Sequence, residues 1–65
     1  MTRYFFDVHF DHAVRRDCAG LDLPNLDEAV AEANQARAEI MAEDKLRRLR
    51  IEIVDQEGRV LASVG

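Results

Sequence analysis

Four residues of the kinds that bind metal ions lie close together near the N-terminus: Asp7, His9, Asp11 and His12. If this segment is a β-strand, alternate residues point to one face, about 6–7 Å apart. Asp7, His9 and Asp11 would then share a face, and carboxylates with imidazoles bind Zn²⁺ and other divalent ions. Alternating polar residues are equally typical of a solvent-facing sheet surface. Metal binding is therefore a minor hypothesis, and the sequence predicts no cofactor.

Cys18, the single cysteine of the chain, is a second candidate for chemistry. A thiol becomes nucleophilic when a base lies beside it, and His9 or His12 would reach Cys18 across a hairpin. The sequence has no Ser-His, Cys-His or paired-acid motif and no glycine-rich phosphate loop. We therefore predict no catalytic residue and no enzyme activity, with Cys18 as an unreactive thiol.

The only basic cluster consists of Lys45, Arg47, Arg48 and Arg50. Such residues contact phosphate, and Phe5, expected on the same sheet face, would stack on a nucleic-acid base. The overall charge of −4 and an acidic helix surface oppose this binding. Nucleic-acid binding through Phe5, Arg48 and Arg50 is accordingly an alternative hypothesis.

The composition is that of one small globular domain spanning residues 1–65, with 48% hydrophobic and 34% charged residues. A chain of this length buries only about 60% of its unfolded surface, so marginal stability is expected. Since one cysteine allows no internal disulfide, a second subunit or very economical packing must supply support. No stretch approaches the ~20 apolar residues of a membrane span, and Asp7 interrupts any signal-peptide core. We expect a cytoplasmic protein that does not bind membranes.

The elements that would position these residues begin with a strand over Arg3–Phe10, where large apolar residues alternate along the chain. Its expected core-facing residues are Tyr4, Phe6, Val8 and Phe10. Val14 to Cys18 is typical of a short, polar second strand at a sheet edge.

Helical periodicity runs from Leu26 to about Glu43, after a favourable N-cap at Asn25 with Glu28 three residues later. The apolar stripe comprises Leu26, Ala29, Val30, Ala33, Ala36, Ile40 and Met41. Arg37 interrupts this stripe. Either its stem passes the sheet edge to reach water, or its guanidinium pairs with a carboxylate. The first alternative is favoured, and it predicts that Arg37→Leu leaves stability unchanged or raises it.

Two further strands, Leu49–Val54 and Arg59–Val64, flank a turn at Asp55–Gly58. Gly58 would supply the left-handed residue of that turn. Val60, Ala62 and Val64 are expected to face the core.

The predicted fold class is α+β: a two-layer ββαββ domain with one helix, residues 26–43, on a four-stranded, mostly antiparallel sheet. Strand order 2-1-3-4 is preferred because it places Asp7 and Asp11 beside Arg48 and Arg50. The order 2-1-4-3 stays open.

A single helix leaves the other face of this sheet uncovered. That face carries Phe5, Val54 and Leu61 among its charges, which makes a modest apolar patch. Edge strands offer a second route to association. We therefore expect a C2 homodimer, formed through this face or through an edge strand.

Several motifs resemble those of a known family. They are Arg3-Tyr4-Phe5-Phe6 in the first strand, Leu23-Pro24-Asn25-Leu26 at the helix entry and Asp55-Gln56-Glu57-Gly58-Arg59-Val60-Leu61 in the last hairpin. Over nearly its full length the chain resembles a family of short bacterial proteins that contain a domain of unknown function. This resemblance implies no activity, cofactor or catalytic residue. A weaker, fold-level likeness is to small antitoxins with a partial RNase H-like domain.

The leading prediction is a non-enzymatic interaction or regulatory module that acts as a homodimer. Its expected interaction residues are Phe5, Val54, Leu61, Arg48 and Arg50. The alternative is a nucleic-acid-linked regulator of the antitoxin type, and divalent-metal binding or enzyme activity comes third.

Overall fold

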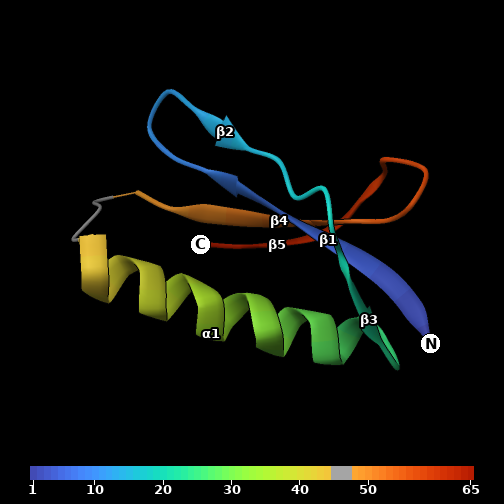
Figure 1. Ribbon diagram of the computed structural model, residues 1–65. Coiled ribbons are helices and arrows are strands. Elements are labelled where there is room, and N and C mark those ends of the chain that lie inside the picture. The colour runs from blue at the N-terminus through green and yellow to red at the C-terminus, as the bar shows by residue number, and fades with distance from the viewer. Residues whose placement is uncertain (45–47) are drawn as a thin grey trace.

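Strand β1 (Thr2–His9) is paired along both of its edges and organises the sheet. The computed structural model describes residues 1–44 and 48–65, which form five strands and one helix (Figure 1). The other elements are β2 (Val14–Arg15), β3 (Leu21–Leu23), α1 (Leu26–Asp44), β4 (Arg50–Val54) and β5 (Val60–Val64). All strand pairs are antiparallel. The predicted α+β fold, one helix on an antiparallel sheet, is confirmed.

The sheet order is β2-β1-β4-β5, which is the preferred order of the four predicted strands, and β3 also pairs with β1. The strand count therefore differs from the prediction by one. Leu21–Leu23, expected only as the approach to the helix, aligns with Thr2–Tyr4 of β1. The predicted second strand ends at Arg15 instead of Cys18. It ends early because the Asp17 carboxylate, not a strand carbonyl, accepts the hydrogen bond of the Phe6 N–H at 3.1 Å.

The register of β1 against β4 contradicts one pairing of charged residues that the sequence predicted. It places Asp7 opposite Glu52 and His9 opposite Arg50. The predicted pairing of Asp7 with a β4 arginine is therefore wrong, although the neighbouring strands are right. Asp7 is instead 3.2 Å from Arg16, on the other side of β1.

The core lies between α1 and the inner face of the sheet. Its buried centre consists of Tyr4, Ala29, Ala33, Ile51 and Ile53. The two alanines are fully buried and let the helix backbone lie close to the sheet. Partly buried side chains, among them Phe6 and Val8 of β1, pack around this centre, as their alternation predicts.

Helix α1 begins where the sequence predicts. The Asn25 side-chain oxygen accepts a hydrogen bond from the Glu28 N–H at 3.0 Å, and the Asn25 carbonyl accepts one from the Ala29 N–H at 3.3 Å. The helix ends at Asp44, one residue beyond the expected boundary. No helix in residues 1–44 or 48–65 is long and apolar enough to cross a bilayer.

The β4–β5 hairpin turns at Asp55–Arg59, with Gly58 in the left-handed region at a φ of 84°, as predicted. A β-bulge at Ile53/Val54 shifts the register so that Val60 is opposite Val54. Val60 therefore lies on the outer face and is 55% exposed. Its predicted core-facing position is wrong because the extra residue of the bulge reverses its face.

Candidate functional site

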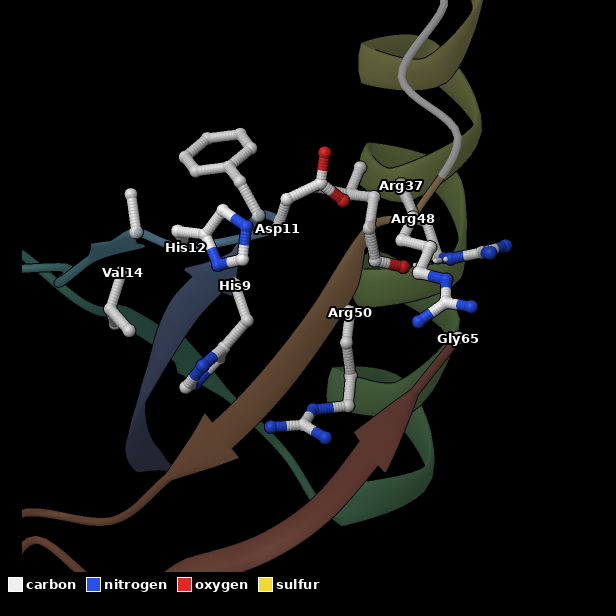
Figure 2. A pocket seen from close by; sticks show the side chains of 11 residues that line it. His9, Asp11, His12, Val14, Arg37, Arg48, Arg50 and Gly65 are labelled. Atoms are coloured by element: carbon white, nitrogen blue, oxygen red, sulfur yellow. Dashed lines mark hydrogen bonds between the residues drawn. The ribbon is translucent and has the colours of Figure 1, made fainter.

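A pocket of about 520 Å³ opens at the end of the sheet where β1 finishes and β4 begins (Figure 2). Its charged and titratable side chains come from three parts of the chain that are distant in sequence: residues 9–12, α1 and residues 48–50. These residues are His9, Asp11, His12, Arg37, Arg48 and Arg50. In Figure 2, His9 and His12 lie on one side, Arg37 and Arg48 lie beside the helix, and Arg50 lies between them in this view. The side chains that line the pocket thus include three guanidinium groups, two imidazoles and one carboxylate, that of Asp11, and Gly65, which follows β5, lines it as well.

Glu52 orients two of these side chains. His9 is the last residue of β1, and Arg50, the first of β4, is its directly opposed partner. One Glu52 carboxylate oxygen is 2.8 Å from His9 Nε2, and the other is 3.4 Å from a terminal nitrogen of Arg50. His9 and Glu52 are each only 23% exposed at the side chain, whereas Arg50 is half exposed. The Glu52 carboxylate therefore restrains both the His9 and the Arg50 side chains while leaving the Arg50 head half exposed beside the pocket.

Arg37 reaches the pocket from the helix. Its Nε donates a hydrogen bond to the carbonyl of buried Leu49 at 2.7 Å. This contact matches neither role considered from the sequence, since the partner is a backbone carbonyl and not water or a carboxylate. Because Nε is used in this bond, the two terminal nitrogens of Arg37 remain for the pocket. Among the described residues they have no hydrogen-bond partner.

The β1–β2 loop supplies the remaining polar lining. The Phe10 N–H donates to the Ala13 carbonyl at 2.9 Å, which closes a tight turn with Asp11 and His12 at its tip. Both side chains are exposed. Phe10 and Val14 add apolar surface beside them.

The four predicted metal-ligand residues are separated by this arrangement. Asp7 is 5% exposed, and its carboxylate accepts hydrogen bonds from the Asp17 N–H and from Arg16. His9 instead contacts the carboxylate of Glu52 on the neighbouring strand β4. In the described part of the chain, no three or more His, Cys, Asp or Glu side chains are placed to hold a metal ion. The structure thus brings His9, Asp11 and His12 to one pocket and leaves Asp7 outside it.

The predicted apolar patch on the outer face is smaller than expected. Val54 is only 8% exposed, and Leu61 is 42% exposed. Phe5 is half-buried because Gly20 lies against its ring: a Cβ at Gly20 would be 2.9 Å from Phe5 Cε1. A ring covered in this way is poorly placed to stack on a base. Of the basic cluster, Arg48 and Arg50 line the pocket, while Lys45 and Arg47 lie outside the described residues.

Cys18 is exposed, beside a separate depression that includes Arg15, Arg16 and Asp17. Within the described residues neither histidine lines this depression. The histidine neighbour considered from the sequence is therefore not found beside Cys18.

Asp17 is the structural residue that sequence reasoning missed. Its carboxylate accepts hydrogen bonds from the N–H groups of Phe6, Ala19 and Gly20, at 3.1, 3.0 and 3.1 Å. Burial raises the pKa of Asp17, but these three bonds lower it by more, so its pKa lies below the ordinary 3.8. The order Asp-Cys-Ala-Gly is a sequence signal for such a turn, since Asp bonds to N–H groups two and three residues later.

The fold and pocket together define a small two-layer α+β domain with a basic pocket at one end of its sheet. The chain belongs to the family described as Domain of unknown function (DUF6894), whose sequence profile matches residues 3–65. The resemblance found in the strand, helix-entry and hairpin motifs is thereby confirmed. No curated protein and no solved structure matches the chain significantly. The likeness to small antitoxins stays a prediction.

Proposed function

We propose that this chain is a cytoplasmic, non-enzymatic interaction or regulatory module of bacteria, and that it acts as a homodimer. The dimer forms when the β5 strands of two copies pair antiparallel across a two-fold axis. The observation that carries this proposal is the character of β5. It is the last strand in the sheet order of the described residues, and Val60–Val64 contains no charged residue.

Proteins usually protect a free sheet edge with charges, proline or a very short strand. The opposite edge of this sheet has such protection, because β2 has two residues, one of them Arg15, and β3 has three, with Asp22 in the middle. β5 has five residues and none of these features, and its one irregularity is the β-bulge at Leu61. An edge without charge, proline or shortening on one side only favours a specific partner for that side.

Pairing centred on Ala62 would place Val60 opposite Val64 of the partner subunit and Leu61 opposite Ser63 of the partner subunit. Val60 and Leu61 are 55% and 42% exposed in the single chain, so this pairing would shield apolar surface. It would also join two small cores under one continuous sheet, which supports a domain of this size.

Analytical ultracentrifugation tests the proposal. We expect the chain to sediment as a dimer at about 100 μM, and Leu61→Lys to sediment as a folded monomer, because it places a charge on the pairing edge. Val14→Lys is the matched control, since Val14 is 47% exposed on the protected edge. A monomeric wild-type chain, or loss of the dimer in Val14→Lys but not in Leu61→Lys, would contradict β5 pairing.

The alternative function, a nucleic-acid-linked regulator of the antitoxin type, is supported by Arg48 and Arg50 lying in one basic pocket. The half-buried Phe5 counts against it. A gel shift with RNA and DNA at low salt tests this alternative, because phosphate contacts weaken steeply with salt. Absence of any shift would remove it.

A further inference from the structure

The basic pocket has a charge opposite to that of the whole chain. The protein carries a net charge of −4, yet the side chains of the pocket lining include three arginines and two histidines against one carboxylate, that of Asp11. The α-carboxylate of Gly65 is the other negative group of the lining, so the three arginines outnumber the negative groups. The arginines come from two separate segments, α1 and the start of β4. A local concentration of positive charge against an acidic background selects anionic ligands.

The arginines also keep donors available for a ligand. Among the described residues, Arg37 and Arg48 form no ion pair with a side-chain carboxylate, and Arg50 has only the 3.4 Å contact with Glu52. Arg37 is held at its Nε by Leu49, and His9 is held by Glu52. Side chains restrained before binding lose less conformational entropy when a ligand arrives. Guanidinium groups match the oxygens of phosphate with paired, charge-assisted hydrogen bonds.

The size and lining of the pocket indicate which other groups a phosphate-containing ligand would have. Small-molecule sites have volumes of about 300–1,000 Å³, and this pocket has about 520 Å³, more than a phosphate ion needs. Phe10 and Val14 provide apolar lining in the same pocket as the arginines. Figure 2 shows Val14 on the side of the pocket where His12 lies. An aromatic ring at such a wall suits a flat, apolar group on the ligand.

We propose that this pocket binds a small phosphate monoester with an aromatic or apolar body, of mononucleotide size. The phosphate is bound by Arg37, Arg48 and Arg50, and the body of the ligand lies against Phe10 and Val14. The proposed dimer is not required, because the pairing edge is β5 residues 60–64 and none of them lines the pocket.

Titration of the ¹⁵N-labelled chain with adenosine monophosphate, inorganic phosphate and adenosine at about 20 mM salt tests this proposal. We expect saturable shifts of the His9, His12 and Arg50 amides with adenosine monophosphate. We expect weaker shifts at the same residues with inorganic phosphate, and none with adenosine. Absence of saturation by adenosine monophosphate at about 10 mM would overturn the proposal. Equal affinity for inorganic phosphate would overturn the role of the apolar wall.

Arg48→Gln is the variant for this test, because its exposed side chain has no hydrogen bond among the described residues and folding should be retained. We expect it to weaken adenosine monophosphate binding about tenfold. The matched control is Arg15→Gln, an exposed arginine outside the pocket, which should bind as the wild type does. Equal losses in the two variants would mean non-specific charge attraction and would overturn the proposal.

Two further measurements separate this site from the other proposals. Leu61→Lys should bind adenosine monophosphate with wild-type affinity even if it is monomeric. An RNA hexamer without a terminal phosphate should bind more weakly than adenosine monophosphate. If the hexamer binds more tightly and depends on Arg48, the pocket belongs to a nucleic-acid surface and the small-ligand proposal fails.

Discussion

Asp7 and Asp17 are joined by a hydrogen bond in which the Asp17 N–H donates to the Asp7 carboxylate at 3.0 Å. The Asp17 carboxylate in turn accepts the N–H of Phe6, the neighbour of Asp7 in β1, at 3.1 Å. These reciprocal bonds attach the segment between β2 and β3 to the edge of β1. They satisfy a strand N–H where regular pairing is interrupted.

Asp17→Ala should therefore be strongly destabilising. It removes the acceptor of three backbone N–H groups and leaves the partly buried Phe6 N–H unpaired. We expect the free energy of unfolding, measured with urea, to fall by about 2–3 kcal/mol. Asp22→Ala is the control, because Asp22 makes only an exposed ion pair with Arg3 at 2.9 Å and should have a small effect. Equal losses in the two variants would contradict this role of Asp17.

The same carboxylate should contribute to acid unfolding. The pKa of Asp17 is lowered in the folded chain, because its three backbone hydrogen bonds outweigh the effect of burial. A lowered pKa stabilises the fold fully above the unfolded-state value near 3.8, and this stabilisation is lost as the pH falls through the lower folded-state value. The stability difference between wild type and Asp17→Ala should thus be constant near neutrality and narrow below that pH. Urea unfolding from pH 7 to pH 2 checks this, and a constant difference throughout would refute it.

Asp55 should add to the same acid sensitivity. Its pKa is also lowered, chiefly by the hydrogen bond from the Arg59 N–H; burial opposes this, and the Glu57 N–H and the Arg59 guanidinium contribute. Its stabilisation has the same sign and is lost over the same acid range. When Asp55→Ala is combined with Asp17→Ala, the free energy of unfolding should therefore depend less on pH in the acid range than in either single variant. If the double variant shows the same pH dependence as Asp17→Ala, Asp55 does not contribute.

Gly20 and Gly58 offer a matched pair that separates backbone strain from crowding. Both have a positive φ, 76° and 84°. A Cβ at Gly20 would lie 2.8 Å from Arg3 Cγ and 2.9 Å from Phe5 Cε1, whereas a Cβ at Gly58 would have no neighbour within 4 Å. We expect Gly58→Ala to cost about 1 kcal/mol from the left-handed conformation alone, and Gly20→Ala to cost about 1–3 kcal/mol more from overpacking. Thermal unfolding measures the loss of stability in each variant, and equal losses would contradict this prediction.

Local sequence signals predicted most of the fold. Asn25 and the apolar stripe located the helix within one residue at its end, because capping and periodicity depend on neighbours along the chain. The features that were missed depend on distant partners. Strand β3 requires the edge of β1, and the outward position of Val60 requires the bulge in β5, where Leu61 is the extra residue.

The candidate site was predicted only in pieces. Arg48 and Arg50 were expected to act together, and they do line one pocket. His9 and His12 were grouped with Asp7 as metal ligands, but the strand places Asp7 against Arg16 and leaves the histidines with the arginines. The spacing of residues along the chain identified candidate site residues. Which of them line the same pocket is determined by the packing of α1 against the start of β4.

Arg37 provides the clearest disagreement between the sequence expectation and the structure. Its Nε donates to the Leu49 carbonyl at 2.7 Å, and Leu49 itself is 2% exposed. Arg37→Leu would leave this carbonyl without its donor in a place that water reaches poorly. We therefore expect a loss of about 1–3 kcal/mol in the free energy of unfolding, in place of the unchanged or raised stability expected from the sequence.

Arg48→Leu is the matched control for this prediction. It removes the same guanidinium from the same pocket, but the Arg48 side chain is exposed and has no hydrogen bond among the described residues. Its effect on stability should stay within about 0.5 kcal/mol. Hydrogen exchange adds a local measurement, because loss of the Arg37 contact should raise exchange first at the start of β4. If Arg37→Leu is as stable as Arg48→Leu and exchange in β4 is unchanged, the Leu49 contact does not support the strand, and Arg37 serves the pocket alone.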